Sequence, residues 1–192
     1  EAEAKQDVKT YGPELRQFYA RQEGDDQAWL ALGRLPRNPN VAAWLDRDLA
    51  RHELADLKSV SFNKGGQKFK LLRVTPTDWS MGGGDKWVSD FKALQPDEVT
   101  QAEAIDFATA QPMVLRYTNG LVIRYENVGA ATVIWSRISA SVARVSGQSK
   151  TARGEVRSLA ADINARYKGW ALRFSADRAP ILLPSQAMLE GR

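Results

Sequence analysis

The sequence contains no cysteine and a single histidine, His52. Without thiols the chain cannot form a disulfide scaffold, a cysteine-ligated metal centre or a thiol nucleophile. With one imidazole it cannot build a histidine metal cluster or a pair of proton-transfer imidazoles. We therefore expect no cofactor, no metal site and no catalytic residues. The alternative is an enzyme that places His52 or clustered carboxylates in a pocket.

Other functional patterns are also missing. No apolar run approaches the roughly 18 residues that a membrane-spanning helix needs, and no charged-then-apolar signal segment opens the chain. No serine stands in a Gly-x-Ser-x-Gly elbow. The run Gly82 to Lys86 lacks the Gly-Lys-Ser/Thr ending of a phosphate-binding loop, and the carboxylate of Asp85 would repel a phosphate. This run instead predicts a flexible loop before a helix that Asp85 caps.

Charge is spread unevenly along the 192 residues, which carry a formal net charge of +4. Positions 137–192 hold ten Lys or Arg residues against four Asp or Glu residues, so this part carries +6 and the remainder −2. A solvated helix and strand surface explains such a distribution. The alternative is a basic C-terminal face that binds an anionic ligand or polymer.

The clearest structural pattern spans residues 113–125, where two alternating runs flank an Asn-Gly pair. A three-residue loop at 118–120, with Gly120 in the left-handed region, predicts a β-hairpin. In that register one face of the hairpin carries Met113, Leu115, Tyr117, Leu121, Ile123 and Tyr125.

Two more hairpins are predicted. Residues 58–74 contain a Gly-Gly pair at 65–66, and a two-residue loop there places Phe62 opposite Phe69. Two short aromatic-bearing runs, 18–21 and 27–32, flank a turn-forming Glu-Gly-Asp-Asp segment. Lysines alternate in the strand from Lys68 to Val74, which follows the Gly-Gly pair; this pattern is typical of a protected sheet edge and favours a monomer.

Helical spacing of apolar residues occurs in three places. Residues 41–54 fit one or two short helical turns, and a short helix is predicted from Asp85 until Gln95-Pro96 stops it. The longest helix is predicted at 151–168, with Gly169 as its C-terminal cap residue. Strand patterns are present at 132–142 and 170–174.

Hairpins interrupted by two or three helices predict an α+β fold, in which an antiparallel sheet carries the helices on one face. We expect a single domain at 15–178, with two similar hairpin-plus-helix halves as an open alternative, and a C-terminal tail at 179–192. Residues 1–14 form an N-terminal segment. Its start, Glu1–Ala4, resembles the remnant of a yeast secretion leader, so we expect these residues to be experimental and a native anchor to be missing.

Most aromatic residues fall on inward positions of these patterns, which favours core packing over stacking on bases or sugars. Two tryptophans fall on outward or loop positions, and arginines are frequent in the last third. Tryptophan and arginine are common anchors at interfaces. The candidate contact residues, for a partner or an anionic ligand, are Trp79, Trp135, Arg137, Arg144, Arg153 and Arg157.

Several short segments, in this order, are similar to those of a known family. They are Tyr19-Ala20-Arg21 with Ala28-Trp29-Leu30-Ala31, Ala43-Trp44-Leu45-Asp46-Arg47, Leu57 to Phe62, Pro96 to Val99, Ile105-Asp106-Phe107, Thr118-Asn119-Gly120-Leu121, and Ile163-Asn164-Ala165-Arg166 with Gly169-Trp170-Ala171. Together they resemble the bacterial domain of unknown function 4340 family, whose members are encoded near ABC transporters of the gliding-motility type. Asn119 and Leu172 depart from the family pattern.

The resemblance implies a non-enzymatic interaction domain of a membrane-anchored protein, whose body lies in the periplasm or otherwise outside the cytoplasm. It implies an accessory role to an ABC transporter or an envelope assembly, with transporter subunits as partners and without nucleic acid. It carries no catalytic residues over to this chain.

Overall fold

The computed structural model describes residues 16–21, 26–33, 54–130 and 133–192. The chain divides into two compact units, residues 1–44 and 45–192, so the division falls inside the range that the sequence predicts as one domain. The helical turns expected at 41–54 and the single histidine, His52, lie outside the described residues, except that Leu54 begins a 3-10 turn, η2 (Leu54–Asp56).

The first unit contains a β-hairpin of β1 (Arg16–Arg21) and β2 (Ala28–Gly33), as the sequence predicts. The strands pair antiparallel, with Tyr19 opposite Leu30. Side chains alternate between the two faces of a strand, and here exposed large apolar side chains occur on both faces: Tyr19 and Leu30 on one, Trp29 on the other.

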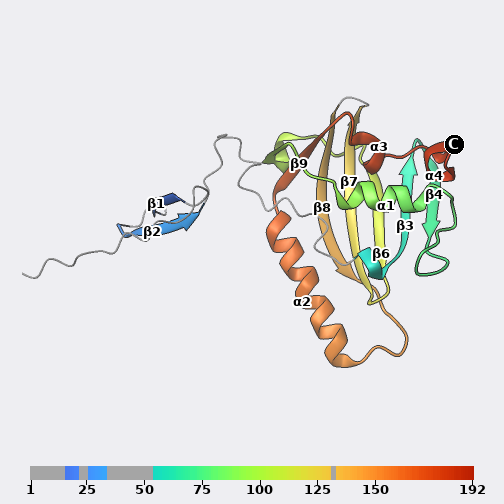
Figure 1. Cartoon of the computed structure of the whole chain (residues 1–192), viewed down its shortest axis with the longest axis horizontal. Helices are drawn as coiled ribbons and strands as arrows, with labels where there is room; N and C mark the ends of the chain where they lie inside the picture. The colour runs from blue at the N-terminus through green and yellow to red at the C-terminus, as the bar shows by residue number, and fades with distance from the viewer. Residues whose placement is uncertain (1–15, 22–25, 34–53, 131–132) are drawn as a thin grey trace, which may run out of the picture. The chain divides into compact units, whose positions relative to one another are not determined.

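The second unit is built on a seven-stranded antiparallel sheet with the strand order β4-β3-β6-β7-β8-β9-β5 (Figure 1). The strands are β3 (Leu57–Lys64), β4 (Gln67–Leu72), β5 (Glu98–Gln101), β6 (Gln111–Tyr117), β7 (Leu121–Ala130), β8 (Val133–Val142) and β9 (Trp170–Ser175). The β3–β4 hairpin pairs Phe62 with Phe69, and its lysine-bearing strand β4 is a sheet edge, both as predicted.

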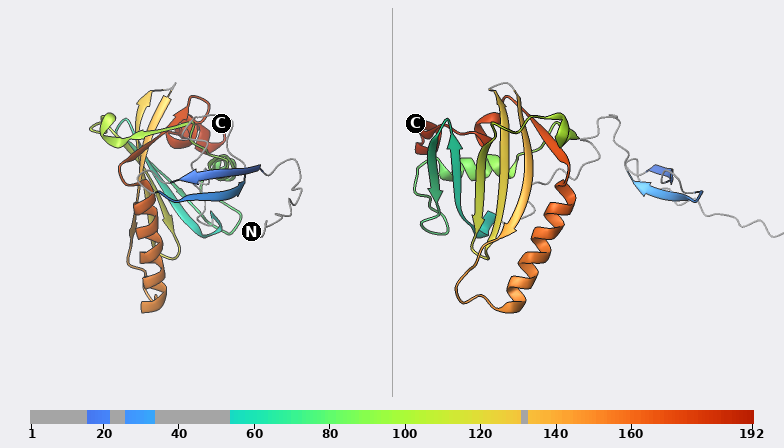
Figure 2. Two further views of the ribbon diagram at one scale, coloured as in Figure 1. Left: turned by 90° about the vertical axis from the view of Figure 1, so that its left-hand side faces the viewer. Right: turned by 180° about the vertical axis from the view of Figure 1, so that it is seen from behind.

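Four helices accompany the sheet in the described residues. They are α1 (Gly84–Lys92), α2 (Lys150–Tyr167), α3 (Ala179–Leu182) and α4 (Gln186–Glu190), and a second 3-10 turn is η3 (Ala102–Ala104). Buried side chains of all four helices join one apolar core with one face of the sheet. Seen from behind, the strands lie in front of α1 (Figure 2). The α+β prediction is therefore confirmed.

The central hairpin has the predicted register, because β6 and β7 pair with Leu115 opposite Ile123. Gly120 has a φ of +90°, which a non-glycine residue rarely adopts. The Asn119 side-chain oxygen accepts a hydrogen bond from the Leu121 N–H at 2.9 Å, which closes the loop. All six residues of the predicted inward face are buried.

Aromatic rings hold α1 against the sheet. Trp87 stacks on Phe91 with ring centroids 5.1 Å apart, and it meets Phe62 edge-on at 5.4 Å. Phe91 in turn meets Tyr125 edge-on at 5.7 Å. The Trp87 Nε1–H donates a hydrogen bond to the Ile181 carbonyl at 2.9 Å, so α1 also binds the C-terminal segment.

The predicted Asp85 cap is wrong. Helix α1 begins at Gly84 with Gly83 as its N-cap, and Asp85 lies in the first turn without a capping hydrogen bond. The glycines are needed for close packing: a Cβ on Gly83 would lie 2.2 Å from the Met188 carbonyl oxygen, and one on Gly84 would lie 2.3 Å from a side-chain carbon of Trp79. The Gly-Gly-Gly run is therefore a packed junction between α1 and α4 rather than a flexible loop.

The segment expected to be a tail, 179–192, forms α3 and α4 and contributes Ala179, Ile181, Leu182 and Leu189 to the core. A buried amide anchors it, because the Asn127 Nδ2 donates a hydrogen bond to the Leu182 carbonyl at 3.1 Å. The Asn127 oxygen accepts one from the Ser136 hydroxyl at 2.6 Å, so this buried polar pair is satisfied. Two helices of four and five residues are too short to show a helical period in sequence.

Helix α2 follows its prediction, with Val156, Ala160 and Ile163 buried and Gly169 at a φ of +79° just beyond its end. Its N-cap is Ser149, whose hydroxyl accepts a hydrogen bond from the Ala152 N–H at 3.1 Å. The helix packs against β8, on the same face of the sheet as α1.

Strand β8 is longer than the ladder that it shares with β9. The two strands pair from Val133 to Ser136, whereas β8 continues to Val142. Helix α2 covers part of the remaining edge: the Asn164 side-chain oxygen accepts a hydrogen bond from the Ala140 N–H at 2.7 Å, and its amide donates one to the Ala140 carbonyl at 2.9 Å. The Asn164 carboxamide thus makes the hydrogen bonds to Ala140 that a neighbouring strand would otherwise make.

Replacing Asn164 by Ala is expected to lower the free energy of unfolding by about 1 kcal/mol, because both hydrogen bonds to Ala140 are lost at a site that water can reach. Asn164→Asp is expected to lose more, since a carboxylate would face the Ala140 carbonyl oxygen. Urea unfolding of both variants measures this, with Asp162→Asn on the exposed side of α2 as the control. Equal losses at positions 162 and 164 would contradict the edge-pairing role.

Candidate functional site: the open face of the sheet

The face of the sheet that points away from the helices carries polar, charged and aliphatic side chains. Because side chains alternate along a strand, the residues between the buried ones point to this side. Among the described residues, this open face includes Ser61, Lys68, Lys70, Val114, Arg116, Val122, Arg124, Glu126, Trp135, Arg137 and Ser139. None of the four described helices contributes to it.

The register of the strands sets the spacing of the cations on the open face. Lys70, Val114 and Arg124 lie in one row that crosses β4, β3, β6 and β7. Arg116 lies in the next row, opposite Val122, and is therefore a diagonal neighbour of Arg124. Diagonal neighbours on paired strands are about 7–8 Å apart. Lys70, Arg116 and Arg124 are all exposed.

One carboxylate of the open face lies between two arginines. Glu126 accepts a hydrogen bond from the Nε–H of Arg124 at 3.3 Å and a short one from the Nε–H of Arg137. Burial alone would raise the pKa of Glu126, but the hydrogen bonds and charges of Arg137 and Arg124 outweigh it, and the pKa lies below its ordinary value. The open face thus already binds one carboxylate of its own chain.

Three cations of the open face have no such partner in the part of the chain that the structure describes. Within residues 54–130 and 133–192, no carboxylate lies at ion-pair distance from Lys68, Lys70 or Arg116. Their charges are therefore exposed to solvent, and the open face is electropositive beside β6.

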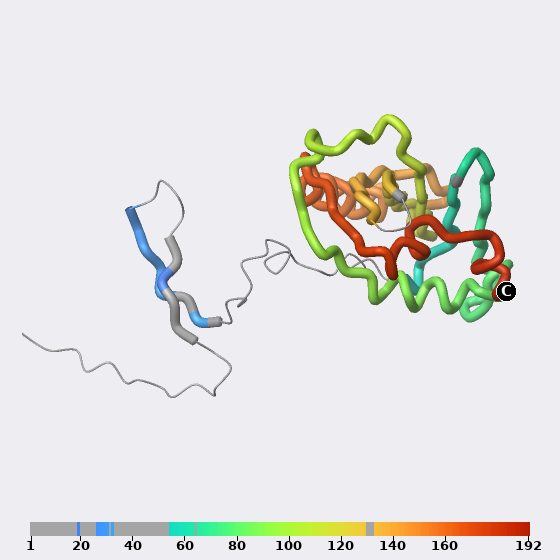
Figure 3. Tube along the Cα trace, turned by 90° about the horizontal axis from the view of Figure 1, so that it is seen from above, coloured from blue at the N-terminus to red at the C-terminus, as the bar shows by residue number. Residues whose placement is uncertain are grey.

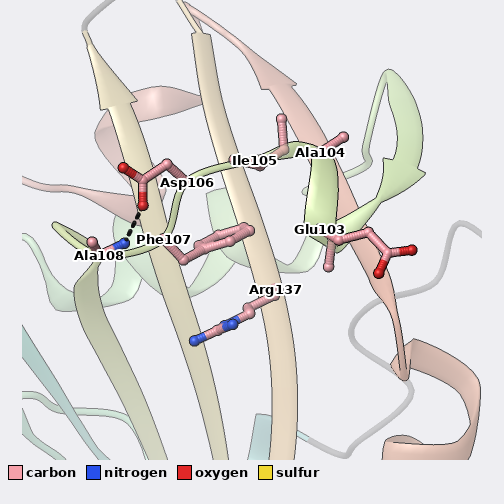
Figure 4. Close-up of a pocket in the computed structure, with 8 residues that line it drawn as sticks. Glu103, Ala104, Ile105, Asp106, Phe107, Ala108 and Arg137 are labelled. Carbon is pink, nitrogen blue, oxygen red and sulfur yellow. Dashed lines mark hydrogen bonds between the residues drawn. The ribbon is translucent and has the colours of Figure 1, made fainter.

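A groove lies at one end of the open face. Seen from above, the chain between α1 and β6 passes around the end of the sheet to this side (Figure 3). Together with Arg137, residues 102–108 line an open groove of ≈ 800 Å³ (Figure 4). The Arg137 guanidinium lies 4.8 Å from the centre of the Phe107 ring, a cation–π contact, and an Asp106 carboxylate oxygen accepts a hydrogen bond from the Ala108 N–H at 2.8 Å.

The chemistry of this groove suits binding. Its lining holds one guanidinium and the carboxylates of Glu103 and Asp106 among alanines, an isoleucine and a phenylalanine. Glu103 and Arg137 point in different directions (Figure 4). Among the described residues, no hydroxyl, thiol, amine or imidazole side chain lines it.

Arg137 also lines a second groove of ≈ 460 Å³, where β8 faces the end of α2. Asn164, Lys168 and Trp170 are among its other residues, and most of its lining is apolar. Trp170 is 40% exposed, which differs from the inward position that its alternation with Leu172 predicts. The cause is local, because this start of β9 pairs with β5 while its ladder with β8 ends at Ser136.

The candidate contact residues do not meet on one surface. Trp135 and Arg137 share the open face on β8. Arg153 and Arg157 lie on α2, which packs on the opposite face, and Arg144 lies in the connection between β8 and α2. The basic C-terminal face expected from the charge count is thus distributed over different sides of the second unit.

The sixth candidate, Trp79, has a packing role. It is half-buried beside the core, and its ring holds the Arg73 guanidinium at 4.9 Å from the ring centre. An isolated β-bridge joins the same two residues, and Gly84 lies directly against the Trp79 side chain. Trp79 therefore fixes the entry to α1.

Lys70, Arg116, Arg124 and Glu126 were not singled out by sequence reasoning. The available signal was their place on the polar side of alternating strands. That signal alone does not show that these residues are neighbours. They lie close together because β3 pairs with β6, which brings β4 and β7 into the same sheet.

Replacing Glu126 by Gln is expected to remove a pH-dependent part of the stability. Since the folded-state pKa is lowered, this carboxylate stabilises the fold above the ordinary pKa of 4.5, and the contribution is lost as the pH falls through the folded-state value. Glu126→Gln should cost about 0.5–1 kcal/mol of unfolding free energy at pH 7 and less in acid. Urea unfolding at pH 7 and at an acidic pH below the folded-state pKa checks this, with Glu155→Gln on α2 as the control. A loss of unfolding free energy that does not change with pH would contradict the prediction.

Two absences concern the described residues alone. No group of three or more His, Cys, Asp or Glu side chains there is arranged to hold a metal ion. No helix there has the length and apolar character needed to cross a membrane.

A family model described as a domain of unknown function (DUF4340) matches residues 10–116, more than half of the chain. The matched range includes the hairpin of the first unit, the β3–β4 hairpin, α1 and β6 up to Arg116. No curated protein and no solved structure matches the chain.

Proposed function

We propose that this chain, which belongs to the family described as domain of unknown function DUF4340, is a non-enzymatic interaction domain that acts outside the cytoplasm. In this proposal it is the folded part of a bacterial protein tethered to the inner membrane, and it serves an ABC transporter or an envelope assembly. Its partners are membrane proteins, chiefly transporter subunits. The location, the anchor and the transporter rest on the family resemblance of the sequence.

The observation that carries the interaction role is the one-sided cover of the sheet. The helices of the second unit pack on one face, and the open face is left with exposed arginines around the aliphatic Val114 and Val122. An antiparallel sheet often has one solvated face, so exposure alone is not a binding argument. Arginine is enriched at protein interfaces, and the combination of arginine with a half-buried aliphatic floor favours this face as the contact surface.

The large pKa shifts among the described side chains belong to core residues. Strongly perturbed pKa values cluster at active sites when they occur in a cleft. Here burial raises the pKa values of the Tyr117 and Tyr125 phenols, and both residues belong to the core on the helix side. Neither lines the two grooves beside Arg137.

Affinity purification of the tagged full-length protein from membranes of its native cell tests the proposal. We expect inner-membrane transporter subunits to co-purify, and to be lost when Arg116 and Arg124 are both changed to Glu. The matched variant Arg157→Glu carries a charge reversal on α2 and should retain them. Recovery of cytosolic proteins alone would contradict the proposal.

Binding of an anionic ligand or polymer is a second candidate, favoured by the cations of the open face that have no carboxylate partner in the described residues. These cations come from β4 and β6 rather than from the C-terminal third. Binding that neutralises several phosphates weakens steeply as the salt concentration rises. Polyanion binding that does not depend on salt, or that does not occur at all, would exclude this candidate.

A further inference from the structure

We infer that the open face binds an extended acidic segment of a partner polypeptide, in which carboxylates occupy alternate positions. This inference rests on the proposed interaction function and names the chemistry of the partner. It places the carboxylates on Arg116 and Arg124, with Lys70 as an outer contact, and it assigns Glu126 the role of an internal competitor.

The first argument is the chemistry already present on the face. Arginine presents a rigid fork of donors that matches a carboxylate. Glu126 uses this match, because its carboxylate accepts hydrogen bonds from both Arg124 and Arg137. Arg116 offers the same donor group beside it without a carboxylate in the described residues. A partner carboxylate can therefore bind Arg116 in the way that the Glu126 carboxylate binds Arg124 and Arg137.

The second argument is spacing. Arg116 and Arg124 are diagonal neighbours on β6 and β7, so their backbones are about 7–8 Å apart. In an extended polypeptide, side chains that point to the same side recur every two residues, or about 6.6–6.8 Å. Carboxylates at alternate positions of a partner segment thus match these two arginines. Lys70 lies three strands from Arg124 in the same row, about 14 Å away, and to one side of the line through Arg116 and Arg124, so its long side chain is only an outer contact.

The third argument is the floor between the cations. Val114 and Val122 are half-buried, and the neighbouring Ser61 and Ser139 are small, so an extended backbone can approach the sheet closely. Single-stranded nucleic acid usually stacks its bases on exposed aromatic rings. Of the aromatic residues on or beside the open face, Phe107 is covered by Arg137, and Trp135 is half-buried and lies two rows of outward-facing residues from Arg124. A polypeptide therefore fits this floor better than a nucleic acid does.

Fluorescence anisotropy of the full chain with a labelled peptide of alternating Glu and Thr tests the inference, with a peptide of alternating Gln and Thr as the neutral control. We expect the acidic peptide to bind and the neutral one not to bind. Arg116→Glu should weaken binding about tenfold, because attraction becomes repulsion at one contact. Arg157→Glu makes the same charge change on α2 and should stay within about twofold of the parent chain.

Glu126→Gln is expected to change the affinity for the acidic peptide in the opposite direction. Removing the internal carboxylate frees Arg124 and Arg137, so binding of the acidic peptide should strengthen about threefold. A general loss of folding cannot produce tighter binding, which makes this variant informative even if others are destabilised. No change, or weaker binding, would overturn the competitor role of Glu126.

Three other results would overturn the inference as a whole. They are an absence of peptide binding by the parent chain, equal weakening by Arg116→Glu and Arg157→Glu, and tighter binding of oligo-dT or of phosphatidylglycerol vesicles than of the acidic peptide at matched ionic strength. Loss of the inference leaves the proposed function intact where transporter subunits still co-purify. If the acidic peptide binds but no membrane protein co-purifies, the proposed membrane location is wrong and the binding of acidic segments still holds.

Discussion

Replacing Trp87 by Ala is expected to lower the free energy of unfolding by about 4 kcal/mol. Trp87 is fully buried, and its ring contacts both Phe91 on its own helix and Phe62 on β3. The substitution leaves a cavity between α1 and the sheet. It also leaves the Ile181 carbonyl without the hydrogen bond from the indole, which loosens α3.

Urea unfolding at equilibrium measures the Trp87 effect. Trp170→Ala is the matched control, because Trp170 is 40% exposed and lines an open groove, so its loss should cost about 1 kcal/mol or less. Amide hydrogen exchange of the Trp87 variant should show the largest added exchange in α3 and α4. Similar costs for the two tryptophans would contradict the view that α1 is the link between the sheet and the C-terminal helices.

Replacing Gly120 by Ala is expected to cost about 3 kcal/mol of unfolding free energy. The φ of +90° strains any L-residue, and the added Cβ would lie 2.8 Å from the Ala143 carbonyl oxygen and 2.9 Å from a methyl group of Val145. The Gly120 carbonyl also accepts a hydrogen bond from the Ala143 N–H at 2.8 Å. The substitution therefore forces the connection between β8 and α2 to shift.

Gly66→Ala separates strain from collision. Gly66 also has a positive φ, +80°, but an added Cβ there would meet nothing within 4 Å. Its substitution should cost about 1 kcal/mol, from backbone strain alone. Thermal or urea unfolding of the two variants gives the comparison, and equal costs would show that packing against Ala143 and Val145 does not hold the central hairpin.

The hairpins could be predicted from the sequence because their information is local. A Gly-Gly pair and an Asn-Gly pair set the loop lengths, and the period of two then settles which residues face inward. The observed pairing of Phe62 with Phe69 and of Leu115 with Ile123 follows from this. Helix α2 could be predicted for the same reason, since its apolar stripe recurs within one continuous segment.

Long-range packing was less accessible. Strand β5 has four residues and owes its place to pairing with β9, where Val99 lies opposite Leu172. Helix α3 depends on the buried Asn127 and on Trp87, which donate hydrogen bonds to its carbonyl groups. Such contacts join residues that are distant in the sequence. The short segments contain no regular spacing of apolar residues that would predict them.

The open face was inaccessible for a related reason. Its arginines stand on polar positions of several strands, and each alone looks like a solvated surface residue. The order β4-β3-β6-β7 brings them together, and that order is a property of the sheet rather than of any one hairpin. Counting charges along the chain instead favoured the C-terminal third, whose candidate contact arginines lie on β8, on α2 and in the loop between them.

Site-specific photo-crosslinking in the native cell tests the central claim that the open face is the contact surface. A photoreactive residue at position 122 replaces Val122 between the arginines, and one at position 157 replaces Arg157 on α2. The account predicts crosslinks to an inner-membrane protein from position 122, competed by the acidic peptide, and few from position 157. Crosslinks that form equally from both positions, or only from α2, would contradict it.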